Sequence, residues 1–191
     1  VAILPGSRKH EVLKNLPAFL KTAEYVQQSV PEANFAVASY NQHQAVVAQK
    51  LIEEHGGNAN IEVYVDRTRE LIHRAECCLA CSGSVSLELL HEATPTVIHY
   101  QVDRLQDFLQ KRFRQCKFIT LVNLLNSERR FEPHDAYDPN DIGNYAEAPF
   151  PEYLTVEDRS AEMSHHVVRW LFNESFRQQT IEKLQPLRDT F

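Results

Sequence analysis

Short hydrophobic runs alternate with longer amphipathic stretches along about the first 120 residues of the chain. The runs predict strands at 1–4, 34–40, 61–65, 77–81 and 96–100, with a short sixth strand at 118–121. Hydrophobic residues at helical spacing predict the intervening helices, at 8–15, from Pro17 to just before Pro31, and at 44–55, 67–74, 85–93 and 103–114. We break the first helix at Pro17 because an interior proline removes a backbone hydrogen bond. Strands that alternate with helices in this way predict a Rossmann-like α/β fold, in which helices flank a parallel sheet.

The regular alternation ends after residue 127. Residues 128–153 carry four prolines and many acidic residues, and we interpret them as an irregular insertion, either a functional flap or a partly mobile loop. Residues 157–172 and 175–188 again show helical spacing and predict two closing helices within 157–190. The whole chain, 1–191, is expected to form a single domain.

Composition narrows the class of protein. The 191 residues are 43% hydrophobic and 24% charged, which is typical of a globular domain. The net charge of −6 argues against a nucleic-acid partner. No hydrophobic run reaches the roughly 18–20 residues of a membrane span, and no signal peptide is visible, so we expect a cytoplasmic location. The chain opens directly on a buried-strand pattern, and we therefore expect it to be a domain excised from a longer, two-domain enzyme.

Two turns of small residues suggest a phosphate site. Gly6-Ser7-Arg8 follows the first strand and Ser82-Gly83-Ser84 follows the fourth, each just before a helix. Free backbone N–H groups at such turns suit a phosphate, and the Arg8 guanidinium can bind two of its oxygens. Glu88 could accept hydrogen bonds from ribose hydroxyls, although it could also serve only as a partner of its helix dipole. Ligands bind at the carboxyl ends of parallel strands, so both turns predict part of a nucleotide-sugar site.

Metal chemistry is not expected. Cys78 and Cys81 have a C-x-x-C spacing, but on a strand residues three apart point to opposite faces, and no second ligand pair follows. We interpret the cysteines as reduced hydrophobic residues and predict no metal cofactor. His10 and Glu11 are expected on a solvated helix face, and Ser7 as the cap of that helix. His99 is interpreted as a hydrogen-bonded core histidine, with a position near the sugar as the alternative.

Four motifs carry a resemblance over residues 1–125. LPGSR is followed in order by ASYN, by SGSVSLELLHEATPTVIHY and by LVNLL. In this order they resemble the C-terminal domain of lipid-A-disaccharide synthase, a glycosyltransferase of the GT-B type. The resemblance implies the second Rossmann-like half of that fold, which holds a UDP-sugar donor. The residues implied in donor binding are Gly6, Ser7 and Arg8 at the diphosphate, Ser82, Gly83 and Ser84 beside it, Glu88 at the ribose and Asn123 along the cleft, with uracil against the backbone of 64–67.

The resemblance also implies a reaction and its partners. UDP-2,3-diacylglucosamine would be joined to 2,3-diacylglucosamine 1-phosphate, releasing UDP and forming the lipid A disaccharide. The catalytic base would lie on the missing N-terminal half, so catalytic residues are unknown here and this chain alone would bind donor without turnover. Further implied partners are that N-terminal domain, a second copy of the chain in a homodimer, and an inner-membrane surface at a basic cluster. The cluster comprises Arg104, Lys111, Arg112, Arg114 and Lys117.

The sequence departs from the family pattern at several positions. Ser84 and Val85 stand where Thr and Ala are common, His99 stands where Gly is common, and Val122 replaces a proline. These differences leave two alternatives open. One is another GT-B enzyme, such as a UDP-N-acetylglucosamine transferase or epimerase, and the other is a non-catalytic nucleotide-sugar-binding module.

Overall fold

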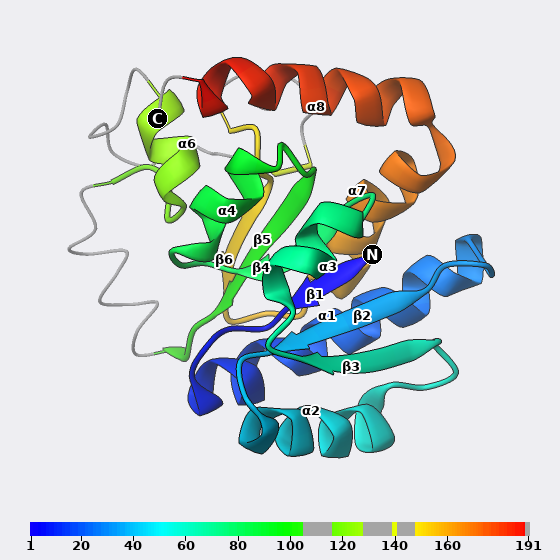
Figure 1. Ribbon diagram of the computed structural model, residues 1–191. Helices are drawn as coiled ribbons and strands as arrows, with labels where there is room; N and C mark the ends of the chain where they lie inside the picture. The colour runs from blue at the N-terminus through cyan, green and yellow to red at the C-terminus, as the bar shows by residue number, and fades with distance from the viewer. Residues whose placement is uncertain (105–115, 128–138, 141–147, 190–191) are drawn as a thin grey trace.

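A computed structural model describes residues 1–104, 116–127, 139–140 and 148–189. Within these residues, six parallel strands form one sheet in the order β3-β2-β1-β4-β5-β6 (Figure 1). This confirms the predicted Rossmann-like α/β fold. The strands are β1 (Ala2–Leu4), β2 (Phe35–Ser39), β3 (Ile61–Val65), β4 (Cys78–Cys81), β5 (Thr96–Gln101) and β6 (Glu152–Thr155).

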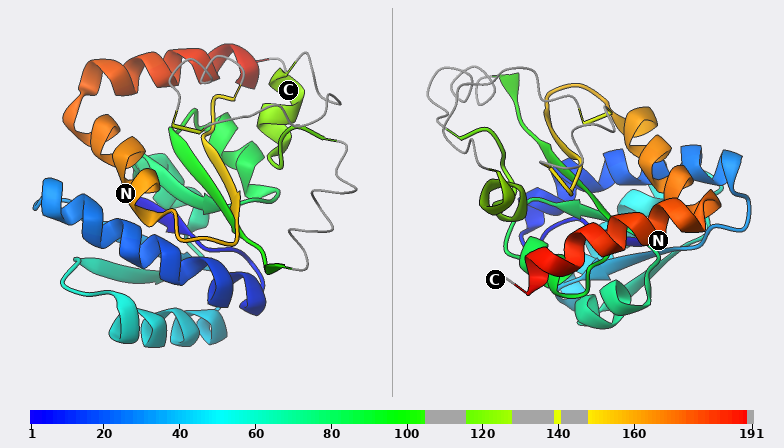
Figure 2. Two further views of the ribbon diagram at one scale, coloured as in Figure 1. Left: turned by 180° about the vertical axis from the view of Figure 1, so that it is seen from behind. Right: turned by 90° about the horizontal axis from the view of Figure 1, so that it is seen from above.

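Helices cover both faces of the sheet (Figure 2). One face carries α1 (Lys9–Ser29), α2 (Gln42–His55) and α7 (Ser160–Phe172). The other carries α3 (Thr68–Arg74), α4 (Val85–His91), α6 (Leu121–Asn126) and α8 (Glu174–Arg188). Along β1, Ile3 packs in the first core, and Ala2 and Leu4 pack in the second. The central strands are therefore hydrophobic at every position, as expected for a sheet buried on both sides.

Helix α1 is continuous through Pro17, so the predicted break at this residue is wrong. Leu16, Phe19 and Leu20 are fully buried on either side of the proline, where α1 packs against α7 and α2. An interior proline costs about 3 kcal/mol, and fully burying one large hydrophobic side chain returns roughly 1.5–3 kcal/mol. The contacts of this face outweigh the local penalty.

The predicted sixth strand at 118–121 is also wrong. Phe118 is irregular, Ile119 and Thr120 form bends that lead into α6, and the sixth strand of the sheet is instead β6. β6 begins at Glu152, inside the segment expected to be irregular, and it pairs with β5. The structure has α7 and α8 in the region of the predicted closing helices. Most of the predicted helix at 103–114, from residue 105 onward, and most of 128–147 lie outside the described residues.

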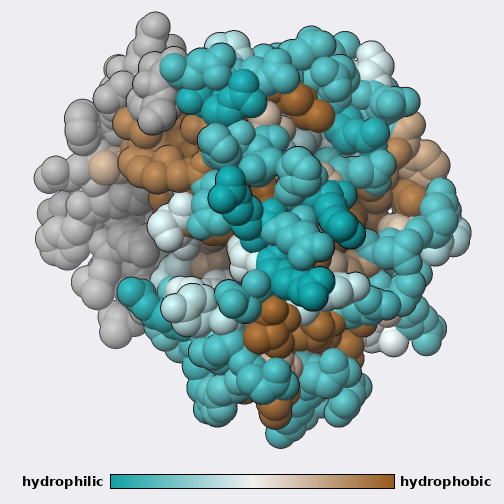
Figure 3. Space-filling view, viewed as in Figure 1, coloured by the Kyte–Doolittle hydropathy of each residue, from teal (hydrophilic) through white to brown (hydrophobic). Residues whose placement is uncertain are grey.

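The surface toward the viewer in Figure 1 is mainly hydrophilic, with hydrophobic side chains gathered over α6 and between α2 and β3 (Figure 3). Among the described residues, no helix combines the length and the hydrophobicity that crossing a membrane requires.

Candidate functional site

The two small-residue turns lie side by side at one edge of the sheet. β1 and β4 are hydrogen-bonded neighbours, and the chain order of the strands reverses between them. Each turn follows the carboxyl end of its strand, at the switch point where open α/β sheets bind ligands. A cavity of about 900 Å³ opens there. It is lined by seven of the eight predicted binding residues: Gly6, Ser7, Arg8, Ser82, Gly83, Ser84 and Glu88.

The first turn is organised by Glu11, a residue for which the sequence predicts a solvated helix face. Its Oε2 accepts hydrogen bonds from the backbone N–H groups of Ser7 and Arg8, each at 3.0 Å. Gly6 has φ +119°, and a Cβ at this position would lie 2.6 Å from Glu11 Oε2. Glycine is therefore required for this carboxylate to close the turn.

Arg8 is the N-terminal boundary residue of α1, so the cap expected from Ser7 is wrong. The Arg8 side chain is 73% exposed at the cavity, and its Nη1 lies 3.5 Å from Glu11 Oε1. Because the Arg8 end of this ion pair is exposed to solvent, the pair is worth at most about 1 kcal/mol, so the guanidinium is available to a ligand at little cost. An acidic residue in the first turn of a helix is the sequence signal that could have identified Glu11.

Asn15 joins the first turn to the neighbouring strands. Its side chain is buried and donates to the carbonyl of Glu11 at 2.9 Å and to the Cys81 sulfur at 3.3 Å. Its Oδ1 accepts the backbone N–H of Gln101 at 2.9 Å. One amide thus fixes α1 against the ends of β4 and β5, a role that helical spacing alone did not reveal. From α2, the Gln44 side chain donates to the Ser7 carbonyl and holds the turn from the other side.

The second turn leaves empty space beside its backbone at Gly83. The Ser82 hydroxyl donates to the Ile119 carbonyl at 3.3 Å, and the Ser86 hydroxyl donates to the Gly83 carbonyl at 2.9 Å. No atom lies within 4 Å of a Cβ built on Gly83, so this part of the cavity wall faces empty space. Glu88 lies one turn farther along α4, with its side chain exposed at the cavity.

Further lining residues come from the ends of β2, β3 and β5 and the start of α3: Tyr40, Asp66, Thr68, Arg69 and Tyr100. Tyr40 is 67% exposed, which is unusual for a large aromatic side chain and leaves its ring free at the rim. Asp66 adopts φ +57° where the chain leaves β3, so the backbone bends sharply at the cavity wall. Within the segment 64–67 expected near uracil, Asp66 lines the cavity and Tyr64 does not.

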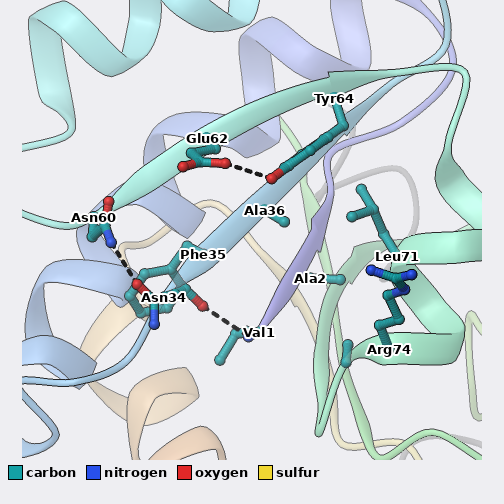
Figure 4. Close-up of a pocket in the computed structure, with 11 residues that line it drawn as sticks. Val1, Ala2, Asn34, Phe35, Ala36, Asn60, Glu62, Tyr64, Leu71 and Arg74 are labelled. Atoms are coloured by element: carbon teal, nitrogen blue, oxygen red, sulfur yellow. Dashed lines mark hydrogen bonds between the residues drawn. The ribbon is translucent and has the colours of Figure 1, made fainter.

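Tyr64 instead lines a second, smaller cavity of about 240 Å³, which extends to the amino ends of β1 and β2 (Figure 4). There the Tyr64 hydroxyl donates to Glu62, and this bond raises the pKa of the phenol. The Asn60 side chain donates to Asn34 in the same way. These polar groups satisfy one another, so the second cavity offers a ligand little unpaired hydrogen-bonding capacity.

Asn123 is not part of the cavity lining, in contrast to the expectation for the LVNLL motif. It is fully buried, and its side chain donates to the Phe150 carbonyl at 2.7 Å and to the Glu152 carboxylate at 3.0 Å. Its Oδ1 accepts the Phe150 N–H at 3.1 Å. The amide therefore ties α6 to the start of β6, and we assign it a structural role.

The cysteines lie where strand geometry places them. Cys78 packs in the core beneath α4, whereas the Cys81 sulfur contacts Asn15 of α1, so the two thiols are on opposite faces. Burial raises the pKa of the Cys81 thiol to about 12. Cys81 touches the cavity but is not a thiolate near neutral pH. Across the described ranges, no group of three or more His, Cys, Asp or Glu residues is arranged to hold a metal ion.

His99 is buried as expected but not hydrogen-bonded as expected. Neither ring nitrogen has a hydrogen-bond partner, and the ring packs edge-on against Phe19 with 5.6 Å between centroids. Burial lowers the pKa of the imidazole to about 4, which keeps it neutral at physiological pH.

The structure is similar to a crystal structure of an S. aureus TarM mutant in complex with fondaparinux, alpha-GlcNAc-glycerol and UDP. The TM-score is 0.55 at 11% identity, over 97% of this chain and 31% of the TarM chain. The likeness shows the fold, which is that of a GT-B glycosyltransferase domain.

Curated relatives with similar sequences are described as lipid-A-disaccharide synthases. The protein from Vibrio vulnificus (strain YJ016) is 27% identical over 172 residues, which are 88% of this chain and 45% of the relative. The protein from Idiomarina loihiensis is 34% identical over 125 residues, or 65% of this chain and 33% of the relative. The chain thus spans between a third and a half of these relatives' length. The model of the family described as lipid-A-disaccharide synthetase matches residues 1–184, and the chain therefore belongs to this family of glycosyltransferases.

Proposed function

We propose that this chain is the donor-binding half of a lipid-A-disaccharide synthase and binds UDP-2,3-diacylglucosamine in the 900 Å³ cavity. The observation that carries the proposal is the convergence of the Gly6–Arg8 turn, the Ser82–Ser84 turn and Glu88 on this one cavity. The acceptor, 2,3-diacylglucosamine 1-phosphate, and the catalytic base would be held by residues outside this chain. Transfer would then release UDP and form the lipid A disaccharide.

The chemistry of the cavity suits a nucleoside diphosphate. Helix α1 begins at the first turn, so the positive end of its dipole and the N–H groups of its first turn lie there. With the Arg8 guanidinium, these groups would stabilise the negative charge that develops on the leaving diphosphate. We place the phosphates between the two turns and the ribose hydroxyls at the Glu88 carboxylate. We place the uracil toward Asp66 and Thr68 at the start of α3.

Calorimetric titration of UDP into the chain tests the proposal. Arg8→Ala should weaken binding at least tenfold, because charge-assisted hydrogen bonds contribute about 1.5–3 kcal/mol each. Arg74→Ala is the matched control: its side chain is 75% exposed and pairs with Glu70 at 3.6 Å, much as Arg8 pairs with Glu11, yet it lies outside this cavity. We expect the control to leave the UDP affinity unchanged.

The same titration with and without EDTA tests whether the diphosphate is bound without a divalent metal, as we propose. Comparison of the acylated donor with UDP-N-acetylglucosamine tests the substrate assignment. Absence of UDP binding at millimolar concentration would contradict the proposal. If Arg8→Ala and Arg74→Ala changed the UDP affinity equally, the nucleotide would bind outside this cavity.

A further inference from the structure

The anion-binding position of the first turn is already filled by an anion of the chain itself. Glu11 Oε2 takes the N–H groups of both Ser7 and Arg8 at 3.0 Å, and Oε1 faces the Arg8 guanidinium at 3.5 Å. Three donors that a phosphate would be expected to use are thus directed at one carboxylate. Glu11 also lines the cavity, so this carboxylate adjoins the space in which a ligand would lie.

The structure around Glu11 keeps the carboxylate in this place. Its side chain is only 13% exposed, while that of Arg8 is 73% exposed. Gly6 lies directly against it, and a methyl group on Gly6 would overlap both Oε2 and the Glu11 Cβ. Of the pair, Arg8 is therefore the side chain free to turn toward a ligand, whereas Glu11 stays at the turn.

We propose that Glu11 sets how tightly the site holds a nucleoside diphosphate, which deepens and rests on the proposed function. Its carboxylate accepts the N–H groups of Ser7 and Arg8, which are then not available to the phosphates, and its negative charge repels the phosphates. The diphosphate is then held by Arg8, by the next N–H groups of α1 and by the Ser82–Ser84 turn. Binding is weaker than this turn could provide, and UDP leaves readily after transfer.

Two substitutions at Glu11 separate its charge from its geometry. Glu11→Gln removes the charge but keeps an oxygen that can accept both N–H bonds, since this capping position takes either residue. Glu11→Asp keeps the charge but is too short to reach the turn. Glu53→Gln, on the exposed side of α2, gives the same change of net charge outside the cavity and serves as the control. Thermal melting identifies any variant that does not fold.

The readout is the affinity for UDP, UMP and uridine by calorimetry, and the UDP dissociation rate by stopped flow. Glu11→Gln removes one negative charge beside the proposed phosphate position, so it should tighten UDP binding by about tenfold or more and slow UDP release. The gain should be smaller for UMP and absent for uridine, which is neutral. Glu53→Gln should show no tightening. Glu11→Asp frees the N–H groups of Ser7 and Arg8 but keeps the negative charge, so it should tighten UDP binding less than Glu11→Gln does.

The outcomes distinguish this inference from the proposed function. If the unmodified chain binds UDP but Glu11→Gln binds it equally or more weakly, Glu11 is a structural cap only and the inference is wrong. A uridine affinity that rises as much as the UDP affinity also contradicts it, because the effect would then not be electrostatic. If the unmodified chain binds no UDP at all, the proposed function itself fails.

Discussion

Substitution by alanine should destabilise the protein at Gly6 but not at Gly83, the two glycines of the candidate site. At Gly6, φ is +119° and an added Cβ would lie 2.5 Å from the Glu11 Cβ and 2.6 Å from its Oε2. Gly6→Ala must therefore strain the backbone and displace the carboxylate that closes the turn. At Gly83, an added Cβ meets no atom within 4 Å, so Gly83→Ala has room in the protein.

The expected cost at Gly6 combines two contributions. A non-glycine residue held in a sparsely populated backbone region costs about 1–3 kcal/mol, and loss of a helix cap about 0.5–2 kcal/mol. Together they lower the free energy of unfolding by about 2–4 kcal/mol, a large share of the roughly 5–15 kcal/mol of a typical domain. Gly83→Ala should change it by less than about 0.5 kcal/mol.

Urea denaturation measures both effects, with the fluorescence of Trp170 as the probe. It is the single tryptophan of the chain and is fully buried beneath α8. Gly6→Ala should lower the midpoint by about 1 M or more, from typical slopes of 1–3 kcal/mol/M, while Gly83→Ala should not move it. UDP titration of Gly83→Ala should show weaker binding, because a methyl group at Gly83 would fill space proposed for the phosphates. A Gly6→Ala midpoint within error of the unmodified chain would refute the account of this turn.

Three further predictions concern buried polar groups. Asn15→Ala should lower the free energy of unfolding, measured in urea, by about 2–3 kcal/mol, because the Gln101 N–H loses its acceptor. The control Thr22→Val removes only a hydrogen bond within α1 and should cost less than about 1 kcal/mol, so equal costs would contradict the bridging role of Asn15. Stability should fall as the pH drops from about 6.5 to about 4, by up to about 3 kcal/mol, because folded His99 stays neutral while the unfolded imidazole binds a proton. Urea midpoints across this range should lose that dependence in His99→Leu and keep it in the control His165→Leu, which changes an exposed histidine; a dependence that survives in His99→Leu would assign it to other groups. Asn123→Ala should cost about 2–3 kcal/mol while changing the UDP affinity less than twofold by calorimetry, and a selective loss of UDP binding would return Asn123 to the site.

Contacts between residues far apart in the sequence explain why the structure differs from the predictions for Pro17, for the sixth strand and for Asn123. Pro17 is a breaker by local rules, but the packing of α1 against α7 and α2 decides that the helix continues. β6 is a short strand after a proline-rich stretch, and only its pairing with β5 makes it part of the sheet. Asn123 occurs in a motif that pointed to the cleft, yet its hydrogen bonds go to Phe150 and Glu152, 27 and 29 residues farther along the chain.

The sequence by itself determined the elements whose causes are local. Continuous hydrophobic runs specify strands buried on both faces, and Gly6–Arg8 and Ser82–Ser84 mark the ends of two of them. Parallel strands place such turns at one edge, so the candidate site followed from the fold class. The Glu11 contacts that close the first turn span only three and four residues, so they belong with the local features. Only the tertiary structure decided which groups complete that site. Asn15 bridges three elements because packing brings the Cys81 sulfur and the Gln101 N–H, 66 and 86 residues farther along the chain, within hydrogen-bonding distance of its amide, and residue spacing does not specify this.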